Sequence, residues 1–231
     1  ASNVTGAIQP IADLADIAHE HGAVMVVDGA QAAGHLPVDC ASLGVDAYAV
    51  AGHKGLLGPQ GIGALYLAPD FQPAELLQGG GGSSLEVNQP VERPDRYEAG
   101  TQNTPGIAGL GAAAEFLRAE GSTLRERERG LTHRLHEGLL GVPGLRVIGP
   151  ALNVPRAPVV SLTHERITPD EIAFALDTRF GIAVRAGLHC SPWTHAAVGT
   201  LESGAVRFSL GWGLDDAAVD FAIDAMRQIC S

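Results

Sequence analysis

The stretch Ala23-Val24-Met25-Val26-Val27-Asp28 is a short, continuous apolar run that ends on a carboxylate. Runs of this kind are typical of a parallel strand buried on both faces of its sheet. Residues 46–50 and 64–67 are two further apolar runs, and residues 10–22 carry apolar side chains at helical spacing. A short helix is predicted at residues 40–43, between the first two strands. This alternation indicates an α/β protein with an open, twisted sheet.

The composition indicates a folded protein and argues against two classes of partner. The chain has 231 residues, of which 45% are hydrophobic, enough for one large domain or two small ones. Its formal net charge of −11 argues against nucleic acid and anionic membrane as partners. No apolar run reaches the length of a membrane-spanning helix. The opening Ala1-Ser2-Asn3-Val4-Thr5-Gly6 resembles the end of a strand, and we expect a fragment of a longer protein.

The three cysteines are odd in number and far apart, which favours free thiols and a cytoplasmic protein. Cys40 and Cys230 lie in apolar patterns, and we interpret both as small core residues. Cys190 lies in a polar segment between His189 and Ser191. The residues alone leave open whether Cys190 is a structural thiol or a nucleophile.

The later part of the chain predicts a long loop followed by helices and strands. Residues 79–104 are polar and proline-containing, so we expect a functional or disordered loop. Two helices are predicted next, the first at residues 106–118 and the second with four leucines facing inward, Leu124, Leu131, Leu135 and Leu139.

The last third of the chain is typical of a smaller α+β domain. Strands are predicted at residues 145–148, 158–162 and 205–210. The stretch Thr168-Pro169-Asp170-Glu171 is a capping box that opens a helix, and Asp215-Asp216 opens the last one.

Several histidines are present, but none has spacing that is diagnostic of a metal site, so we expect no metal. His189 and His195 flank Cys190 and are candidates to tune its thiol. The remaining helical histidines are predicted to lie on the surface; they are His19, His21, His133 and His136.

Lys54 is the only lysine of the chain, since 14 of the 15 basic residues are arginine. An amine can lose its proton and attack a carbonyl, whereas a guanidinium cannot. Asp28 ends the first predicted strand, and Lys54 follows the second. Ligands of open α/β sheets bind at the carboxyl ends of strands, so both side chains are site candidates. The alternatives are a surface lysine and a turn or helix-cap aspartate.

Five stretches carry a resemblance to a known family. They are Asp28-Gly29-Ala30-Gln31, Gly52-His53-Lys54, Gly55-Leu56-Leu57-Gly58-Pro59-Gln60-Gly61, Glu98-Ala99-Gly100-Thr101 and Arg185-Ala186-Gly187-Leu188-His189-Cys190. In this order they resemble the class V aminotransferase family of pyridoxal phosphate (PLP) enzymes, and within it the cysteine desulfurases and selenocysteine lyase-like members. The resemblance runs through essentially the whole chain but covers only the later part of a family member.

The resemblance implies an α/β fold, the PLP-dependent transferase fold type I. Residues 1–120 would form the later part of the large PLP-binding domain, with a mixed, mostly parallel sheet. Residues 121–231 would form a small α+β C-terminal domain.

The resemblance also implies which residues hold PLP. Lys54 would carry the cofactor as a Schiff base and shuttle the substrate's Cα proton. Asp28 would pair with the pyridine nitrogen, Gln31 with the ring's phenolic oxygen, and His53 with the phosphate. Thr101 would reach the phosphate of the other subunit's cofactor, which makes the expected assembly a homodimer.

For the substrate, the resemblance implies Asn3 beside the amino acid and Arg207 on its carboxylate, with Arg185 as a second candidate. A guanidinium fork suits a carboxylate bidentately. Cys190 would be the nucleophile that takes sulfur from L-cysteine, leaving alanine and an enzyme persulfide. A sulfur-acceptor protein is a further expected partner.

Two alternatives remain open beside the desulfurase. The first is a class V aminotransferase or selenocysteine lyase, acting on a related amino acid. The second is a catalytically incompetent fragment, because the family's preceding segment supplies a phosphate-binding turn and a ring-stacking side chain. Ala51 also stands where the family often has a phosphate-binding serine.

Overall fold

The computed structural model describes residues 1–81 and 87–231, which form two compact units. One, here called the β1–β3 unit, comprises Ile11–Ala30 and Val38–Arg118. The other, the β4–β7 unit, comprises Ala1–Pro10, Gln31–Pro37 and Ala119–Ser231. The assignment of residues 1–120 and 121–231 to large- and small-domain parts stays a prediction.

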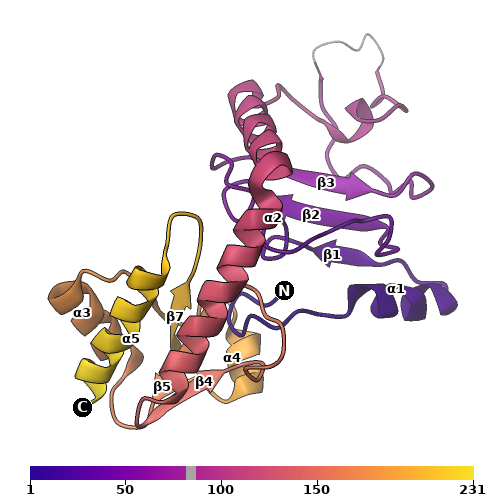
Figure 1. Ribbon diagram of the computed structural model, residues 1–231. Helices are drawn as coiled ribbons and strands as arrows, with labels where there is room; N and C mark the ends of the chain where they lie inside the picture. The colour runs from indigo at the N-terminus through magenta and orange to yellow at the C-terminus, as the bar shows by residue number, and fades with distance from the viewer. Residues whose placement is uncertain (82–86) are drawn as a thin grey trace. The chain divides into compact units, whose positions relative to one another are not determined.

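The β1–β3 unit contains a three-stranded mixed sheet with the order β1-β2-β3 (Figure 1). β1 and β2 are parallel, and β2 and β3 are antiparallel. The predicted helix and the three predicted strands are confirmed. Their bounds are Ile11–Glu20 for α1, Val26–Asp28 for β1, Ala47–Ala51 for β2 and Gly63–Leu67 for β3.

Only one face of this sheet is well buried within the described chain, so the prediction that β1 is buried on both faces is wrong. Val27 and Tyr48 pack in a core cluster with Val45. Side chains alternate between faces along a strand, and on the opposite face Val26 and Leu65 remain 61% and 56% exposed. The described elements therefore cover one side of the sheet and leave the other open to solvent.

Residues 40–43 form hydrogen-bonded turns, so the helix predicted there is wrong. The Asp39 carboxylate accepts hydrogen bonds from the backbone N–H groups of Ala41 and Ser42, at 3.1 and 3.4 Å. Gly44 then adopts φ +64°, which ends the turn. Too few residues lie between Asp39 and Gly44 to propagate a helix.

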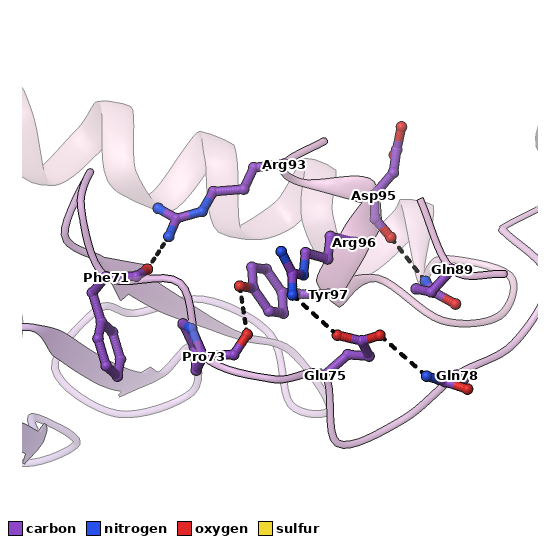
Figure 2. A network of polar contacts seen from close by, with 9 residues as sticks. All are labelled: Phe71, Pro73, Glu75, Gln78, Gln89, Arg93, Asp95, Arg96 and Tyr97. Atoms are coloured by element: carbon purple, nitrogen blue, oxygen red, sulfur yellow. Dashed lines mark hydrogen bonds and ion pairs between the residues drawn. The ribbon is translucent and has the colours of Figure 1, made fainter. Parts of the chain in front are cut away.

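The loop after β3 contains one short 3-10 helix, η1 (Asp95–Tyr97), in its described part. A polar network ties this segment to the chain just after β3 (Figure 2). The Arg93 guanidinium donates to the carbonyl of Phe71, and the Tyr97 hydroxyl donates to the carbonyl of Pro73 at 2.9 Å.

Arg96 and Glu75 add an ion pair to this network at 3.3 Å. These contacts give the described part of the predicted loop at residues 79–104 a defined conformation. The part of that prediction that falls on residues 82–86 lies outside the described residues.

α2 (Thr104–Leu140) is one helix of 37 residues, so the prediction of two separate helices is wrong. An interior glycine such as Gly121 costs a helix only about 1 kcal/mol relative to alanine. The inward placement of Leu131, Leu135 and Leu139 is confirmed, because all three are buried. Their burial favours a continuous helix over a break at Gly121. The fourth predicted leucine, Leu124, is only partly buried.

The β4–β7 unit contains an antiparallel sheet with the order β4-β5-β7-β6, packed against α3 and α5 (Figure 1). Its strands are β4 (Leu145–Ile148), β5 (Val159–His164), β6 (Arg185–Gly187) and β7 (Ala205–Ser209). Its later helices are α3 (Pro169–Phe180), α4 (Pro192–Val198) and α5 (Asp216–Cys230). The predicted strands, capping box and last helix are confirmed. β6 and α4 were not predicted, since three and seven residues carry too little periodicity.

The first ten residues pack onto the sheet of the β4–β7 unit. Val4 is fully buried, and its carbonyl accepts a hydrogen bond from the Ser161 hydroxyl at 2.5 Å. The Ala157 N–H donates to the carbonyl of Gly6 at 2.8 Å. These contacts hold Asn3 at a fixed place on this unit.

His136 on α2 is only 3% exposed, so the prediction of a surface histidine is wrong. Arg156 donates from Nη1 to His136 Nδ1 at 3.1 Å, and from Nη2 to the carbonyls of Thr5 and Ile148. Burial first, and then the charge of Arg156, lower the pKa of His136 to about 4. The ring is therefore a neutral acceptor at neutral pH.

We expect the free energy of unfolding to fall as the pH drops from about 6.5 to about 4. In this window His136 is protonated in the unfolded chain but not in the folded chain. Across the whole window this difference lowers the free energy of unfolding by an amount on the order of 3 kcal/mol. Urea unfolding at successive pH values, with His136→Gln as the control, measures the difference. Equal pH slopes for the two proteins would contradict the expectation.

Candidate active site

Two predicted site residues lie at the same edge of the β1–β3 sheet. Asp28 is the last residue of β1 and pairs in register with Ala49 of β2. Lys54 comes three residues after Ala51, where β2 ends. Because β1 and β2 are parallel, their carboxyl ends lie at one edge, which is where ligands of such sheets bind.

The segment that carries Lys54 is a closed loop. The Gly58 N–H donates to the carbonyl of Gly52 at 2.7 Å, and the Leu57 N–H donates to the carbonyl of Lys54 at 2.9 Å. Gly52 in turn donates to the carbonyl of Ile62 at 2.9 Å. These bonds fix the backbone from which the lysine side chain projects.

The carboxylate of Asp28 is oriented by the backbone that follows it. Its Oδ1 accepts a hydrogen bond from the Ala30 N–H at 2.9 Å, while the Gly29 N–H donates to the carbonyl of Ala49 at 2.8 Å. A Cβ on Gly29 would lie 1.9 Å from Cε1 of Tyr48. This turn therefore requires glycine directly after the carboxylate.

We expect Gly29→Ala to destabilise the protein by about 1–3 kcal/mol, the usual cost of overpacking a filled site. Gly111 is the matched control, since it lies in α2 and a Cβ there would meet nothing within 4 Å. Gly111→Ala should leave stability unchanged or raise it by up to about 1 kcal/mol. Chemical denaturation of both variants is the measurement, and similar midpoints would contradict the expectation.

The donor set of this unit fits PLP. Asp28 offers a carboxylate, Lys54 a half-buried primary amine, His53 an exposed imidazole and Thr101 an exposed hydroxyl. These groups match the ring nitrogen, the aldehyde and the phosphate of that cofactor in chemical type. Gln31, the fifth predicted cofactor residue, belongs to the β4–β7 unit and is partly buried.

The β4–β7 unit brings the predicted substrate residues together. Arg185 on β6 and Arg207 on β7 are directly paired across the two strands. Arg207 donates from Nη1 to the carbonyl of Asn3 at 3.0 Å and from Nε to Ser209 Oγ at 3.1 Å. Burial first, and then the charge of Arg185, lower the pKa of Arg207. Two adjacent guanidinium groups suit an anionic ligand such as a carboxylate.

Cys190 is exposed and sits beside this pair of arginines. Arg185 Nη2 lies 3.2 Å from Cys190 Sγ, within hydrogen-bonding distance. His189 and Cys190 both adopt left-handed backbone conformations, with φ of 53° and 59°. Each such non-glycine residue costs roughly 1–2 kcal/mol, so other contacts must hold the loop in place.

Asn3 supplies two of those contacts. Its Nδ2 donates to the carbonyl of His189 at 2.7 Å, and its Oδ1 accepts from the Ser191 hydroxyl at 2.9 Å. Asn3 was predicted to lie beside the substrate, but its bridge across the Cys190 loop was not predicted. No sequence signal could have found it, because Asn3 and the loop are far apart in the chain.

The other two cysteines differ from Cys190, and all three are free thiols. Cys230 is buried in the core of the β4–β7 unit, and Cys40 is partly buried against the core cluster of the β1–β3 unit. Burial raises the pKa of both thiols. Their interpretation as small core residues is confirmed for Cys230, while Cys40 lies at the edge of its core.

Residues 1–221 match the family model described as aminotransferase class-V, and the chain belongs to that family. It is 38% identical over 238 residues to a probable cysteine desulfurase of Chlamydia trachomatis, covering 99% of this chain and 57% of that protein. The chain thus spans little more than half the length of this relative.

Solved structures agree with the family assignment. The apo structure of a cysteine desulfurase from Thermococcus onnurineus has a TM-score of 0.89 at 33% identity, covering 99% of this chain and 58% of that one. A cysteine desulfurase from Escherichia coli has a TM-score of 0.87 at 30% identity, covering 100% and 58%. The fold is therefore the PLP-dependent transferase fold type I, as the sequence predicted.

Among the described residues, no helix is both long and apolar enough to cross a membrane.

Proposed function

We propose that this chain is the later part of a PLP-dependent cysteine desulfurase that converts L-cysteine to alanine and leaves a persulfide on Cys190. The observation that supports this most is the exposed Cys190 in a left-handed loop with Sγ 3.2 Å from Arg185. The adjacent Arg207 offers a second cation for the substrate carboxylate. The names of the relatives point the same way.

Each residue has a role in this proposal. Bound PLP supplies an electron sink that weakens the bonds at the substrate's Cα. Lys54 would hold the cofactor through its amine and would move the Cα proton, while Asp28 would pair with the ring nitrogen and His53 with the phosphate. Gln31 would hydrogen-bond the phenolic oxygen, and Thr101 would reach the phosphate held by a second subunit, so we propose a homodimer.

The sulfur transfer is carried by Cys190. Its thiolate attacks the sulfur of L-cysteine, and the Cβ–S bond breaks. The electron pair of that bond stays on Cβ, which takes up a proton, so alanine leaves and Cys190 keeps the persulfide. Arg207 and Arg185 hold the carboxylate, with Asn3 beside the substrate. The persulfide then passes to a sulfur-acceptor protein, and the free thiols favour a cytoplasmic location.

The test is turnover of L-cysteine by the protein supplied with PLP. Alanine and reductant-released sulfide in equal amounts, with a persulfide mapped to Cys190 by peptide mass analysis, support the proposal. Selenide release from selenocysteine without sulfide from cysteine would favour a selenocysteine lyase. Transfer of the amino group to a keto acid would favour an aminotransferase.

A further inference from the structure

A chain of buried side chains lies behind Cys190. His189 is 2% exposed, His195 on α4 is fully buried, and Thr200 is 2% exposed. His195 Nδ1 lies 2.7 Å from Thr200 Oγ1, and His195 Nε2 lies 3.1 Å from His189 Nδ1. His189 Nε2 lies 3.0 Å from the carbonyl oxygen of Arg185. The four residues therefore form one continuous line of hydrogen bonds.

The carbonyl group at one end of this line fixes which atom donates in each hydrogen bond. The carbonyl of Arg185 only accepts, so His189 Nε2 carries a proton and donates. In the neutral ring His189 Nδ1 then accepts, and His195 Nε2 must donate to it. His195 Nδ1 accepts in turn from the Thr200 hydroxyl. Burial lowers the pKa of both histidines, which agrees with neutral rings.

This line of bonds acts on a loop whose backbone is unfavourable by itself. His189 and Cys190 are consecutive left-handed residues without glycine, a conformation that persists only when surrounding contacts enforce it. Both nitrogens of the His189 ring are hydrogen-bonded, and the backbone carbonyl of His189 accepts a hydrogen bond from Asn3. The same backbone places Cys190 Sγ within reach of Arg185.

We propose that His195 and Thr200 are positioning residues, which hold the His189 ring and thereby keep Cys190 Sγ against Arg185. That this positioning serves catalysis rests on the proposed function, in which Cys190 is the nucleophile. Neither His195 nor Thr200 is needed to touch the substrate, because both act through His189. The hydrogen bonds to Thr200 at one end and to the carbonyl of Arg185 at the other explain why two buried, neutral histidines lie beside the exposed thiol of Cys190.

Thr200 offers a test that preserves side-chain volume. Thr200→Val removes the hydroxyl that donates to His195 Nδ1, whereas Thr200→Ser keeps it. The readout is the alkylation rate of Cys190 by iodoacetamide, measured against Cys40 in the same chain by peptide mass analysis. We expect Thr200→Val to change this ratio about fivefold, the scale of one hydrogen bond, and Thr200→Ser to leave it unchanged.

A double-mutant cycle asks whether the effect runs through Arg185. Arg185→Gln removes the guanidinium beside Sγ, and its effect on the alkylation ratio should be non-additive with that of Thr200→Val. Additive effects would overturn the proposal. So would a Thr200→Val ratio equal to that of the unchanged protein.

Nitrogen-15 NMR of the unchanged protein gives an independent measurement. Both rings should show the Nε2–H tautomer, and an Nδ1–H tautomer in either ring would overturn the proposal. Neither alkylation nor NMR requires L-cysteine turnover. A protein that fails to release sulfide but shows the expected ratios and tautomers would therefore contradict the proposed function and leave this inference standing.

Discussion

Lys54→Arg should abolish covalent capture of PLP and lower L-cysteine turnover by at least about 10²- to 10⁴-fold, the usual contribution of a proton-transferring side chain. A guanidinium keeps the positive charge but can neither attack the cofactor's aldehyde nor give up its proton. Because Lys54 is the only lysine of the chain, the N-terminal amine is the one competing primary amine.

The measurement is addition of PLP, reduction with borohydride, and mass analysis of the intact chain and its peptides. One phosphopyridoxyl group should appear on the peptide that contains Lys54, and none should appear there in the arginine variant. Circular dichroism of both proteins controls for folding. Modification confined to the N-terminus in a folded, unchanged protein would show that Lys54 does not hold PLP.

Cys190→Ala should reduce sulfur release from L-cysteine by at least about 10³-fold, since removing the nucleophile of a covalent mechanism is felt on that scale or above. Cofactor capture at Lys54 should survive, because Cys190 has no part in holding PLP in the proposed function. The two variants therefore separate loss of cofactor from loss of the sulfur-accepting thiol.

The matched controls for Cys190→Ala are the other two cysteines. Cys40→Ala and Cys230→Ser leave the loop beside Arg185 unchanged, so sulfide release per folded protein should stay close to that of the unchanged protein. Sulfide release that persists in Cys190→Ala would remove this thiol from the mechanism. Transamination by that variant, with no sulfide from any variant, would point to the aminotransferase alternative.

Local signals in the sequence were sufficient for most of the regular structure. The capping box at Thr168 opens α3 as predicted, because a cap is built from residues three apart in the chain. The apolar runs at β2 and β3 were also visible, since both strands concentrate apolar residues in a short window. Elements of three and seven residues, β6 and α4, carry too short a pattern to be seen.

Long-range packing decided the features for which the sequence pattern gave a wrong prediction or no prediction. His136 was predicted at the surface from the helical pattern, yet it is buried and hydrogen-bonded to Arg156, 20 residues away in the chain. The continuity of α2 past Gly121 depends on Leu131, Leu135 and Leu139, which pack in the core of the β4–β7 unit.

For the candidate site, the sequence by itself determined the family resemblance and the identity of the reactive groups. A single amine at Lys54, a carboxylate ending a strand at Asp28, and a thiol in a polar segment are chemical facts of the chain. Only the tertiary structure decided what surrounds Cys190: the paired guanidinium of Arg185, the bridge from Asn3, and the buried line of His189, His195 and Thr200. The physical reason is that hydrogen bonds are formed by atoms within about 3 Å, and folding rather than sequence order brings those atoms together.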